Sequence, residues 1–308
     1  MTEAGFRDVC AVVVTYHPDL PLLSELLAAL CPQVGAVIVV DNTGGRIDGL
    51  TGMVEGAGGT LLAREGNLGL ASAQNLGIGW AREHGFAQVL LSDQDSVPAP
   101  GMVAALQEAI AGLGTHTRIA AAGPVFRDLR EDRQAPFVRI GFPFNRKLWC
   151  ESSRRTIACD FLISSGTLIP LAVIDAVGPM NEGLFIDSVD LEWSFRARAR
   201  GYTLHGVCAA AMHHHLGDAR RSLPFGIGQI VVHGPQRLYY MMRNRLRLYG
   251  MPHTPRIWVA QDVPRMLVKF LLFGVFVGPR WRNLRYMARG VLDGIRGRSG
   301  ACPLHQDP

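Results

Sequence analysis

The sequence predicts an α/β fold, in which an open, mainly parallel β-sheet carries helices on its faces and is followed by a C-terminal helical extension. Three observations favour this class. Short apolar runs, often β-branched, alternate with longer amphipathic stretches, the order of elements found in parallel sheets. Polar residues follow the ends of the apolar runs. About half of the residues are apolar, which is enough for a large core and excludes a disordered chain.

The N-terminal half is expected to alternate strands with helices. The run V-C-A-V-V-V-T at 9–15 is rich in β-branched residues and suits a central strand. Further strands are expected at 36–40, 60–63, 88–92 and 119–123, and helices at 20–30, 70–84 and 102–113. Since strands that are joined through helices pair in parallel, their carboxyl ends should gather at one edge of the sheet.

The pattern is less regular after residue 126. Residues 127–159 are first charged and then aromatic and basic, which indicates an inserted hairpin or loop over the sheet. An apolar strand is expected at 160–170 and a short helix at 173–177. A longer helix should follow Asp187 as its N-cap, and another strand is expected at 202–207.

The C-terminal extension, expected over 223–308 after a catalytic domain at 1–222, is basic. Between residues 236 and 298 there are thirteen Lys and Arg residues and two acidic residues, a balance of +11. Its unbroken apolar run of eight residues at 270–277 is too short to span a bilayer. Two interpretations stay open: helices that pack on the catalytic domain, or an amphipathic anchor with arginines toward lipid phosphates. The positive charge suggests an anionic partner, namely a membrane surface, a polyanionic lipid or nucleic acid. Of these we expect the anionic membrane surface, and not nucleic acid, as a partner.

Cysteine usage and the N-terminus bear on the compartment. Six cysteines are scattered without C-x-x-C spacing, and several lie in apolar runs. We therefore expect reduced, mostly buried thiols and neither a disulfide framework nor a zinc site. The first residues lack the apolar core of a signal peptide. These features predict a cytoplasmic protein that is peripheral at the inner face of the plasma membrane if the basic segment docks there.

Two carboxylates, Asp93 and Asp95, follow the predicted strand at 88–92 in the sequence D-Q-D-S. Residues i and i+2 of an extended chain point to one side, at the edge where open α/β sheets place their ligands. Paired carboxylates suit a hard divalent cation that carries a diphosphate, and the alternative is a solvated acidic turn. The motifs G-x-G-x-x-G and G-x-x-x-x-G-K-[ST] are absent, which removes the main support for a dinucleotide site or a P-loop.

Two later stretches also carry candidate site residues. Asp187, Asp190 and Glu192 lie at the predicted start of a helix, where carboxylates either cap the helix and match its dipole or serve chemistry. Three consecutive histidines at 213–215 follow the predicted strand at 202–207. A histidine there is either a surface residue or a ligand of the same cation as the carboxylate pair.

Taken together, these stretches resemble the inverting GT-A glycosyltransferases of family 2, and within them the bacterial rhamnosyltransferases that use dTDP-L-rhamnose. The matching motifs are V-V-V-T-Y at 12–16, V-D-N-T at 40–43, N-L-G at 67–69, A-Q-N-L-G at 73–77, D-Q-D-S at 93–96, F-I-D-S-V-D-L-E-W at 185–193, H-H-L-G-D at 214–218 and R-L-Y-Y-M-M-R-N at 237–244. Their order and spacing carry the resemblance, and D-Q-D-S is the element that favours rhamnose.

The resemblance implies a nucleotide-binding part at about 9–125 and an acceptor part at about 159–222. For five matched residues the resemblance implies contacts with the nucleotide, that is, with its base, its ribose or the atoms next to them. These residues are Thr15, Tyr16, Asp41, Asn67 and Asn75.

The resemblance also implies the residues of the reacting centre. Asp93 would contact the nucleotide side and, with Asp95, the metal ion, which should be Mg²⁺ or Mn²⁺. His214 would complete the metal site, although the histidines on either side leave open which imidazole faces the ion. Asp190 lies at the family's general-base position and would take the proton of the acceptor hydroxyl.

Elementary chemistry agrees with this assignment. A sugar diphosphate leaves as an anion, so a cation offsets the developing charge, and an acceptor hydroxyl needs a base. One base acting in one in-line displacement inverts the anomeric centre. We expect transfer of L-rhamnose from dTDP-L-rhamnose to a hydroxyl of a lipid-linked or cell-surface glycan. The alternatives are a UDP-sugar donor (galactofuranose, glucose or N-acetylglucosamine) and a non-catalytic membrane-surface protein on a degenerate transferase fold.

Overall fold

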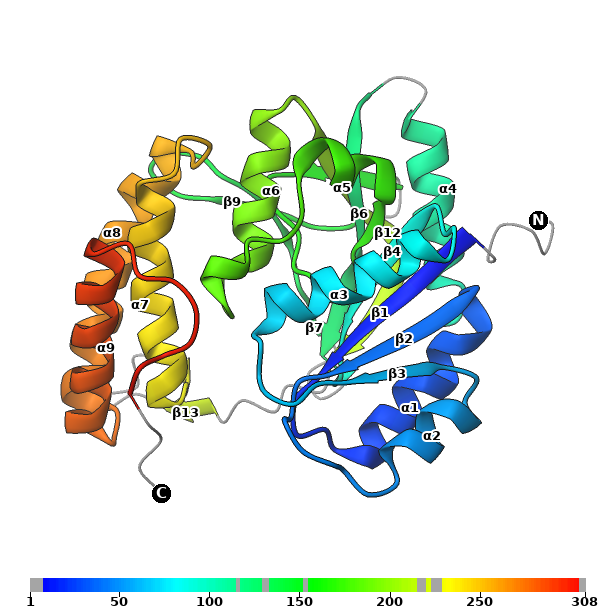
Figure 1. Cartoon of the computed structure of the whole chain (residues 1–308). Helices are drawn as coiled ribbons and strands as arrows, with labels where there is room; N and C mark the ends of the chain where they lie inside the picture. The colour runs from blue at the N-terminus through cyan, green and yellow to red at the C-terminus, as the bar shows by residue number, and fades with distance from the viewer. Residues whose placement is uncertain are drawn as a thin grey trace.

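The computed structural model describes residues 8–114, 117–128, 133–151, 155–214, 220–222 and 229–304 of the chain. Figure 1 shows helices packed around a twisted sheet, and a group of C-terminal helices that stands beside it. The expected α/β class and the helical C-terminal extension are therefore confirmed.

The main sheet of the described residues has ten strands, with a path in the order β10-β12-β6-β11-β4-β1-β2-β3; β5 pairs with β12, and β7 with β6. The strands are β1 Val9–Thr15, β2 Ala36–Asp41, β3 Thr60–Ala63, β4 Gln88–Asp93, β5 Ser96–Pro98, β6 Ile119–Asp128, β7 Arg133–Gln134, β10 Thr156–Cys159, β11 Leu168–Pro170 and β12 Thr203–His214. Strands β3, β2, β1 and β4 are parallel, so their carboxyl ends meet at one edge. Beyond β4 the sheet is mixed, because β11 is antiparallel to both of its neighbours.

Helices cover both faces of this sheet (Figure 1). They are α1 Leu20–Leu30, α2 Leu50–Gly56, α3 Leu70–Glu83, α4 Met102–Gly114, α5 Leu171–Val177 and α6 Val189–Ala199. One core packs α3, α5 and α6 against one face, and a second core packs α1, α2 and α4 against the other. Because both faces are covered, β1 is buried along its whole length, as its unbroken apolar run predicts.

Four elements differ from the sequence-based expectation. Strands β6 and β12 run on to Asp128 and His214, because they pair with each other in parallel over this extra length. The strand expected at 160–170 is reduced to β11, since only its last three residues reach the sheet. Helix α2 was not expected, and its seven residues bury Leu50 and Val54.

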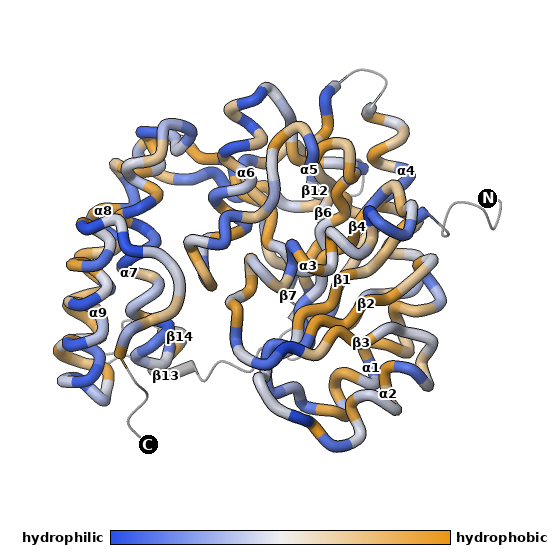
Figure 2. Tube along the Cα trace, viewed as in Figure 1, coloured by the Kyte–Doolittle hydropathy of each residue, from blue (hydrophilic) through white to orange (hydrophobic). Residues whose placement is uncertain are grey.

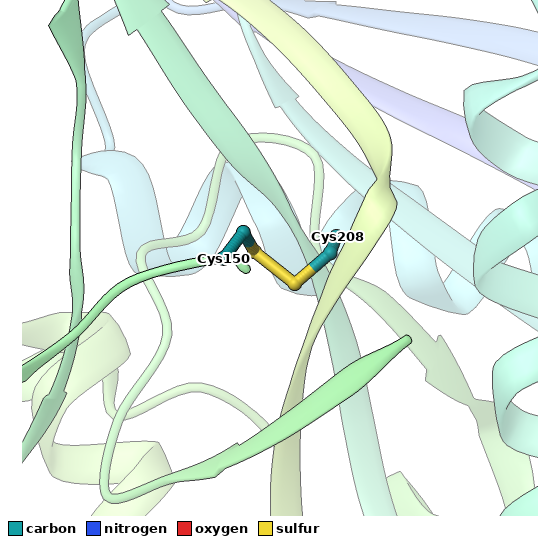
Figure 3. Close-up of a disulfide and its surroundings, with 2 residues drawn as sticks. All are labelled: Cys150 and Cys208. Atoms are coloured by element: carbon teal, nitrogen blue, oxygen red, sulfur yellow. A yellow bond between two sulfur atoms is a disulfide. The ribbon is translucent and has the colours of Figure 1, made fainter. Parts of the chain in front are cut away.

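The region after β7 contains the expected hairpin, formed by β8 Phe137–Arg139 and β9 Arg146–Leu148. Directly after it, Cys150 forms a disulfide with Cys208 of β12, with 5.5 Å between the Cα atoms (Figure 3). The expectation that all six cysteines are reduced is therefore wrong. The two residues are 58 positions apart in the sequence, and only the antiparallel pairing of β10 with β12 brings their segments together.

The C-terminal helices are α7 Pro235–Tyr249, α8 Arg256–Leu271 and α9 Arg280–Ile295, with a π-helical turn at Leu272–Phe276. They enclose a small core of their own between α7, α8 and α9. At Gly290 of α9 a Cβ atom would lie 2.4 Å from the Tyr239 carbonyl oxygen, so glycine allows this close helix contact. In the part of the chain that the structure describes, no helix is both long and apolar enough to cross a membrane.

Candidate active site

The carboxylate pair Asp93 and Asp95 lies where β4 ends and β5 begins, at the carboxyl edge of the parallel strands. Gln94 between them ties this turn to the end of β1. The Tyr16 N–H donates to Gln94 Oε1 at 2.7 Å, and Gln94 Nε2 donates to the Tyr16 carbonyl at 3.2 Å. On the other side, the Asp93 N–H donates to Ser165 Oγ at 3.1 Å. The turn that carries the pair is therefore anchored by both neighbouring segments.

Thr15 and Asp41 end the adjacent strands β1 and β2 and are hydrogen-bonded to each other. Thr15 Oγ1 donates to Asp41 Oδ1 at 2.8 Å, and Thr43 Oγ1 donates to the same oxygen at 2.7 Å. Thr15 is 0% exposed and Asp41 is 1% exposed. The structure thus brings these two predicted site residues together, and the Thr15 hydroxyl orients the Asp41 carboxylate.

Asn67 lies in the turn between β3 and α3. Its Oδ1 accepts a hydrogen bond from the Gly69 N–H at 2.8 Å, and Asn42 Nδ2 donates to the Gly69 carbonyl at 3.0 Å. Gly69 has a φ angle of +86°, and a Cβ atom there would lie 2.7 Å from Phe185. Glycine is therefore required where this turn meets the segment that leads to α6.

Asn75, which was expected on the nucleotide side, contacts a different segment. Its Nδ2 donates to the Met180 carbonyl at 3.0 Å and to Glu182 Oε1 at 2.9 Å, and the Met180 N–H donates to Asn75 Oδ1 at 2.9 Å. These bonds engage the amide group with the segment that leads to α6. The predicted nucleotide contact of Asn75 has no support in them.

Asp190 lies in the first turn of α6, and the backbone that enters this helix is unusual. Phe185, Asp187 and Ser188 have φ angles of 66°, 69° and 62°, in the left-handed region that costs free energy for residues other than glycine. Ser188 holds the N-cap position, and no side chain caps the helix. The expectation that Asp187 is the N-cap is therefore wrong, because the left-handed turn inserts Ser188 between Asp187 and the helix.

Two residues of α7, Arg243 and Asn244, hold this strained turn from the side of the C-terminal helices. Asn244 Nδ2 lies within hydrogen-bond distance of the carbonyl oxygens of Leu184 (3.0 Å), Ile186 (2.7 Å) and Asp187 (2.8 Å). Arg243 Nη2 donates to the Leu184 carbonyl at 2.7 Å. Both α7 side chains are 0% exposed. The R-N pair that ends the C-terminal motif thus positions the turn before Asp190, a role that the sequence did not reveal.

The carboxylates of the two halves are close enough to repel one another. Burial, together with the charges of Asp95 and Asp190, raises the pKa of Asp93 to about 7. Burial raises the pKa of Asp190 to about 6, although the Leu191 N–H, which donates to Asp190 Oδ1 at 2.8 Å, favours the ionised form. Carboxylates whose pKa values are raised by burial and by each other are typical of functional sites.

Glu192, two residues after Asp190, has a structural role. Its side chain is buried, and its two oxygens each accept a hydrogen bond from Arg196 at 2.9 Å. His253 Nε2 also lies 2.9 Å from Glu192 Oε1. Glu192 therefore links α6 to the segment between α7 and α8, and it points away from the carboxylates of the sheet edge.

The residues around Asp93 and Asp95 fit a divalent cation in part. A cation relieves the repulsion between two such carboxylates, and carboxylate oxygens are ligands that Mg²⁺ and Mn²⁺ accept. Within the described residues, however, no three His, Cys, Asp or Glu side chains gather closely enough to hold an ion. The carboxylate half of the predicted site is thus in place, and metal binding stays a prediction.

His213 and His214 are the last two residues of β12. His214 pairs with Ser96 in the ladder between β12 and β5, so its backbone lies one residue from Asp95 along the partner strand. Nδ1 of His213 is buried and has no hydrogen-bond partner among the described residues. The side chain of His214 and the whole of His215 lie outside the described residues, so the identity of the metal-facing imidazole stays open.

Comparison with known proteins decides the family. Residues 10–168 match the profile of "Glycosyl transferase family 2", a range that covers more than half of the chain and includes the strand-end residues of β1, β2 and β4. This chain belongs to glycosyl transferase family 2. Over 298 residues the glycosyltransferase is 31% identical to the dTDP-rhamnosyl transferase RfbF of Shigella flexneri, and the match covers 95% of this chain and 97% of that protein.

Solved structures show the same fold at low identity. The S. aureus TarS fragment 1–349 in complex with UDP-GlcNAc has a TM-score of 0.57 and 14% identity, and the match covers 94% of this chain and 81% of that chain. GalNAc-T7 with UDP, GalNAc and Mn²⁺ has a TM-score of 0.56 and 13% identity, and the match covers 69% of this chain but 44% of that one. The glycosyltransferase therefore has the GT-A fold, as the sequence predicts.

Replacing Asn244 with Ala should lower both stability and turnover of the glycosyltransferase. The change removes this donor from the carbonyl oxygens of Leu184, Ile186 and Asp187, which costs about 1–3 kcal/mol. The Leu184 oxygen keeps Arg243 as a donor. Release of the strained turn should also misplace Asp190 and lower kcat per folded molecule about tenfold or more. Chemical denaturation and steady-state kinetics measure the two effects.

Asn283 of α9 supplies a matched control for this variant. It is also buried, and its Nδ2 donates to the carbonyls of Phe273 at 3.1 Å and Val277 at 2.9 Å, within the C-terminal helices. Asn283→Ala should lower stability by a similar amount and leave kcat per folded molecule unchanged. An equal fall of kcat in both variants would show that Asn244 has only a structural role.

Proposed function

We propose that this glycosyltransferase moves L-rhamnose from dTDP-L-rhamnose to an acceptor hydroxyl, with inversion at the anomeric carbon and with Asp190 as the general base. The observation that carries the proposal is that Asp190, in the first turn of α6, lies close enough to Asp93 at the end of β4 for its charge to raise the pKa of Asp93. The choice of donor is supported by the 31% identity with a dTDP-rhamnosyl transferase over nearly the whole chain.

In this proposal the donor lies across the carboxyl edge of the parallel strands. Asp41, oriented by Thr15, and the turn of Asn67 would hold the base and ribose, beside the exposed ring of Tyr16. Asp93 and Asp95 lie at the end of β4, beside β1, where the diphosphate would follow the nucleoside. They would hold Mg²⁺ or Mn²⁺, which offsets the negative charge of the departing diphosphate when bound.

The acceptor would be activated by Asp190. Its carboxylate accepts the hydroxyl proton while the acceptor oxygen forms a bond to the anomeric carbon and the bond from that carbon to the diphosphate oxygen breaks. The products are the glycoside and dTDP, and one displacement gives one inversion. The pKa of about 6 suits this role, because Asp190 is ionised near neutral pH and yet is a stronger base than an ordinary aspartate.

The rate should depend on pH in a way that this pKa determines. With Asp190 ionised only above about pH 6, kcat/KM should fall about tenfold per unit below that pH and level off above about pH 7. The pH profile should be measured at a saturating concentration of Mg²⁺ or Mn²⁺, so that the titration of Asp93 does not add a second pH-dependent change to the rate. A profile that stays level down to pH 5 would contradict a base with this pKa.

Donor choice is tested directly with purified protein and mass spectrometry. dTDP-L-rhamnose should be consumed in the presence of detergent extracts that contain lipid-linked glycans, and UDP-galactofuranose, UDP-glucose and UDP-N-acetylglucosamine should not be. Consumption of a UDP-sugar instead would replace the donor in this proposal. Binding without turnover of every donor would support the alternative of a non-catalytic protein on a transferase fold.

We also propose that the C-terminal helices dock on the inner face of the plasma membrane, which would place the enzyme beside a lipid-linked glycan acceptor. Exposed apolar residues recur at spacings of four along α8 and the π-helical turn, in the C-terminal helices where hydrophobic and hydrophilic stretches alternate (Figure 2). They are Val263, Leu267, Leu271 and Val275, with exposed fractions of 36%, 56%, 62% and 51%. Trp281 is 80% exposed, and arginines lie at the start of α8 and at the start of α9. An apolar stripe with a basic border is typical of interfacial helices.

Sedimentation with vesicles tests this docking. The protein should bind vesicles with anionic phosphatidylglycerol more tightly than neutral phosphatidylcholine vesicles, and binding should weaken as salt is added, because the charges are screened. Replacing both Leu267 and Leu271 with Glu should abolish binding, whereas the circular dichroism spectrum should not change, since both side chains are exposed. Undiminished binding of this double variant would contradict the proposal.

A further inference from the structure

Three cationic side chains of the C-terminal helices gather on the side that faces the catalytic carboxylates. Arg237, Met241 and Arg245 follow one another at intervals of four residues along α7 and therefore share one face of that helix. Lys269 of α8 reaches this face, with its Nζ 3.7 Å from the Met241 sulfur. Lys269 thus lies against the middle of a stripe that has an arginine at either end.

This cationic cluster, defined as Arg237, Arg245 and Lys269, lies beside the Asp190 turn. All three charges act on Asp187, three residues before Asp190, where they oppose the effect of burial that raises its pKa. Arg237 acts on Asp93 as well. The cluster therefore begins near the carboxyl edge of the sheet and extends along α7, away from Asp93 and toward α8.

Two members of the cluster, Arg245 and Lys269, are incompletely paired with carboxylates in the described part of the chain. Arg245 Nε lies 3.4 Å from Asp262 Oδ2, but the same oxygen accepts a hydrogen bond from the Tyr249 hydroxyl at 2.7 Å. Nη1 of Arg245 is buried and has no hydrogen-bond partner in the described part of the chain. Within that part, no carboxylate forms an ion pair with Lys269, and the polar contact of its Nζ is the methionine sulfur.

The pKa of Lys269 indicates that the positive charges of the cluster lie close together. Burial, followed by the charge of Arg245, lowers the pKa of Lys269 to about 8; Arg237 acts in the same direction, whereas Asp187 and Asp262 act against it. Holding like charges together in a partly buried place costs free energy unless an anion joins them. Arginine and lysine in such a group are the side chains that bind phosphate oxygens in proteins.

We propose that this cationic cluster binds the phosphate or diphosphate group of an amphiphilic acceptor, beside the base Asp190. This rests on the proposed function, since it names the class of acceptor for that same site. The position of Arg245 and Lys269, near Asp187 and away from Asp93, favours the acceptor over the donor as the source of the phosphate. The outer face of the helix that carries Lys269 exposes Leu267 and Leu271, which suits the apolar tail of such a molecule.

Calorimetry with the full-length protein tests this assignment through three probes: geranyl diphosphate, geraniol and dTDP. Geranyl diphosphate should bind, and geraniol should not bind measurably, because it lacks the anion. Lys269→Met should weaken geranyl diphosphate binding about tenfold or more, the worth of a hydrogen bond between charged groups. Lys269→Arg, which keeps the charge, should restore most of the affinity, and dTDP affinity should stay within about twofold in both variants.

Arg265→Gln is the matched control, because it removes one positive charge from the exposed outer face of the same helix. It should leave binding of all three probes unchanged. The proposal is overturned if Lys269→Met weakens dTDP as much as geranyl diphosphate, since the cluster would then serve the donor. It is equally overturned if Lys269→Met and Arg265→Gln have the same effect, or if geraniol binds as tightly as its diphosphate. Failure of the wild-type protein to bind dTDP would instead count against the proposed donor.

Discussion

Asp190→Asn should lower turnover by about 10²–10⁴, the usual worth of a positioned general base. Asparagine keeps the shape of the side chain but cannot accept the acceptor proton. The affinity for dTDP-L-rhamnose should stay within a few-fold of wild type, because the base acts on the acceptor and not on the donor. Turnover, measured by product formation, and donor affinity, measured by calorimetry, separate these two effects.

Stability distinguishes this role from that of a helix-capping residue. The pKa of Asp190 is raised in the folded state, so its contribution to stability is present below about pH 4 and is lost as the pH rises through about 6. At pH 8 the neutral asparagine should therefore leave the melting temperature of the metal-free protein unchanged or higher. A cap or dipole partner would show the opposite, a lower melting temperature with activity per folded molecule retained.

Glu192→Gln is the control for this pair of measurements. Its carboxylate accepts two hydrogen bonds from Arg196 and lies next to His253, so its loss should lower the melting temperature and leave kcat per folded molecule near wild type. If Glu192→Gln is inactive but still binds donor, and Asp190→Asn turns over normally, the base has been assigned to the wrong carboxylate.

The second large effect is expected for Asp95→Asn. Removing one of the two carboxylates that end β4 and its turn should abolish metal-dependent donor binding and lower turnover by at least about 10², since the charge on the leaving diphosphate is then no longer offset. The pKa of Asp93 should fall in this variant, because the charge of Asp95 helps to raise it. Titration of Mn²⁺ and Mg²⁺ into the protein with dTDP checks the metal dependence.

Asp175→Asn provides the comparison for Asp95. Asp175 pairs with Arg82 on the surface, and its side chain is 60% exposed, so its replacement should change neither metal affinity nor turnover. Near wild-type turnover of Asp95→Asn in excess EDTA would show that the reaction does not need a metal ion at this carboxylate.

The two halves of the site differ in how far the sequence could predict them. The nucleotide side follows from local patterns, because parallel strands gather their ends at one edge, and the structure does bring Thr15, Asp41, Asp93 and Asp95 to such ends. Asn75 shows the limit of this reasoning. An amide on an amphipathic helix has the same pattern whether it faces a ligand or, as here, bonds to the Met180 backbone.

Contacts between segments that are far apart in the chain could not be predicted from the sequence. The bond between Cys150 and Cys208 depends on strand pairing across 58 residues, and spacing alone gave no sign of it. The N-cap of α6 was misplaced because the left-handed turn at Asp187 and Ser188 has no local cause in residue type. That turn is stable because α7, some 55 residues later in the chain, supplies the donors of Asn244.

The sequence by itself determined the α/β class, the carboxylate pair at the end of a buried strand, and the basic character of the C-terminal helices. These properties depend on periodicity and charge, which are local. Only the tertiary structure decided that Asp190 lies close enough to Asp93 to raise its pKa, that the C-terminal helices hold the Asp190 turn, and that Arg237, Arg245 and Lys269 form one cluster. Each of these contacts joins segments that are far apart in the sequence and meet only in the folded protein. There, burial and neighbouring charges change the pKa values and the hydrogen-bond partners of the side chains, which residue type alone does not predict.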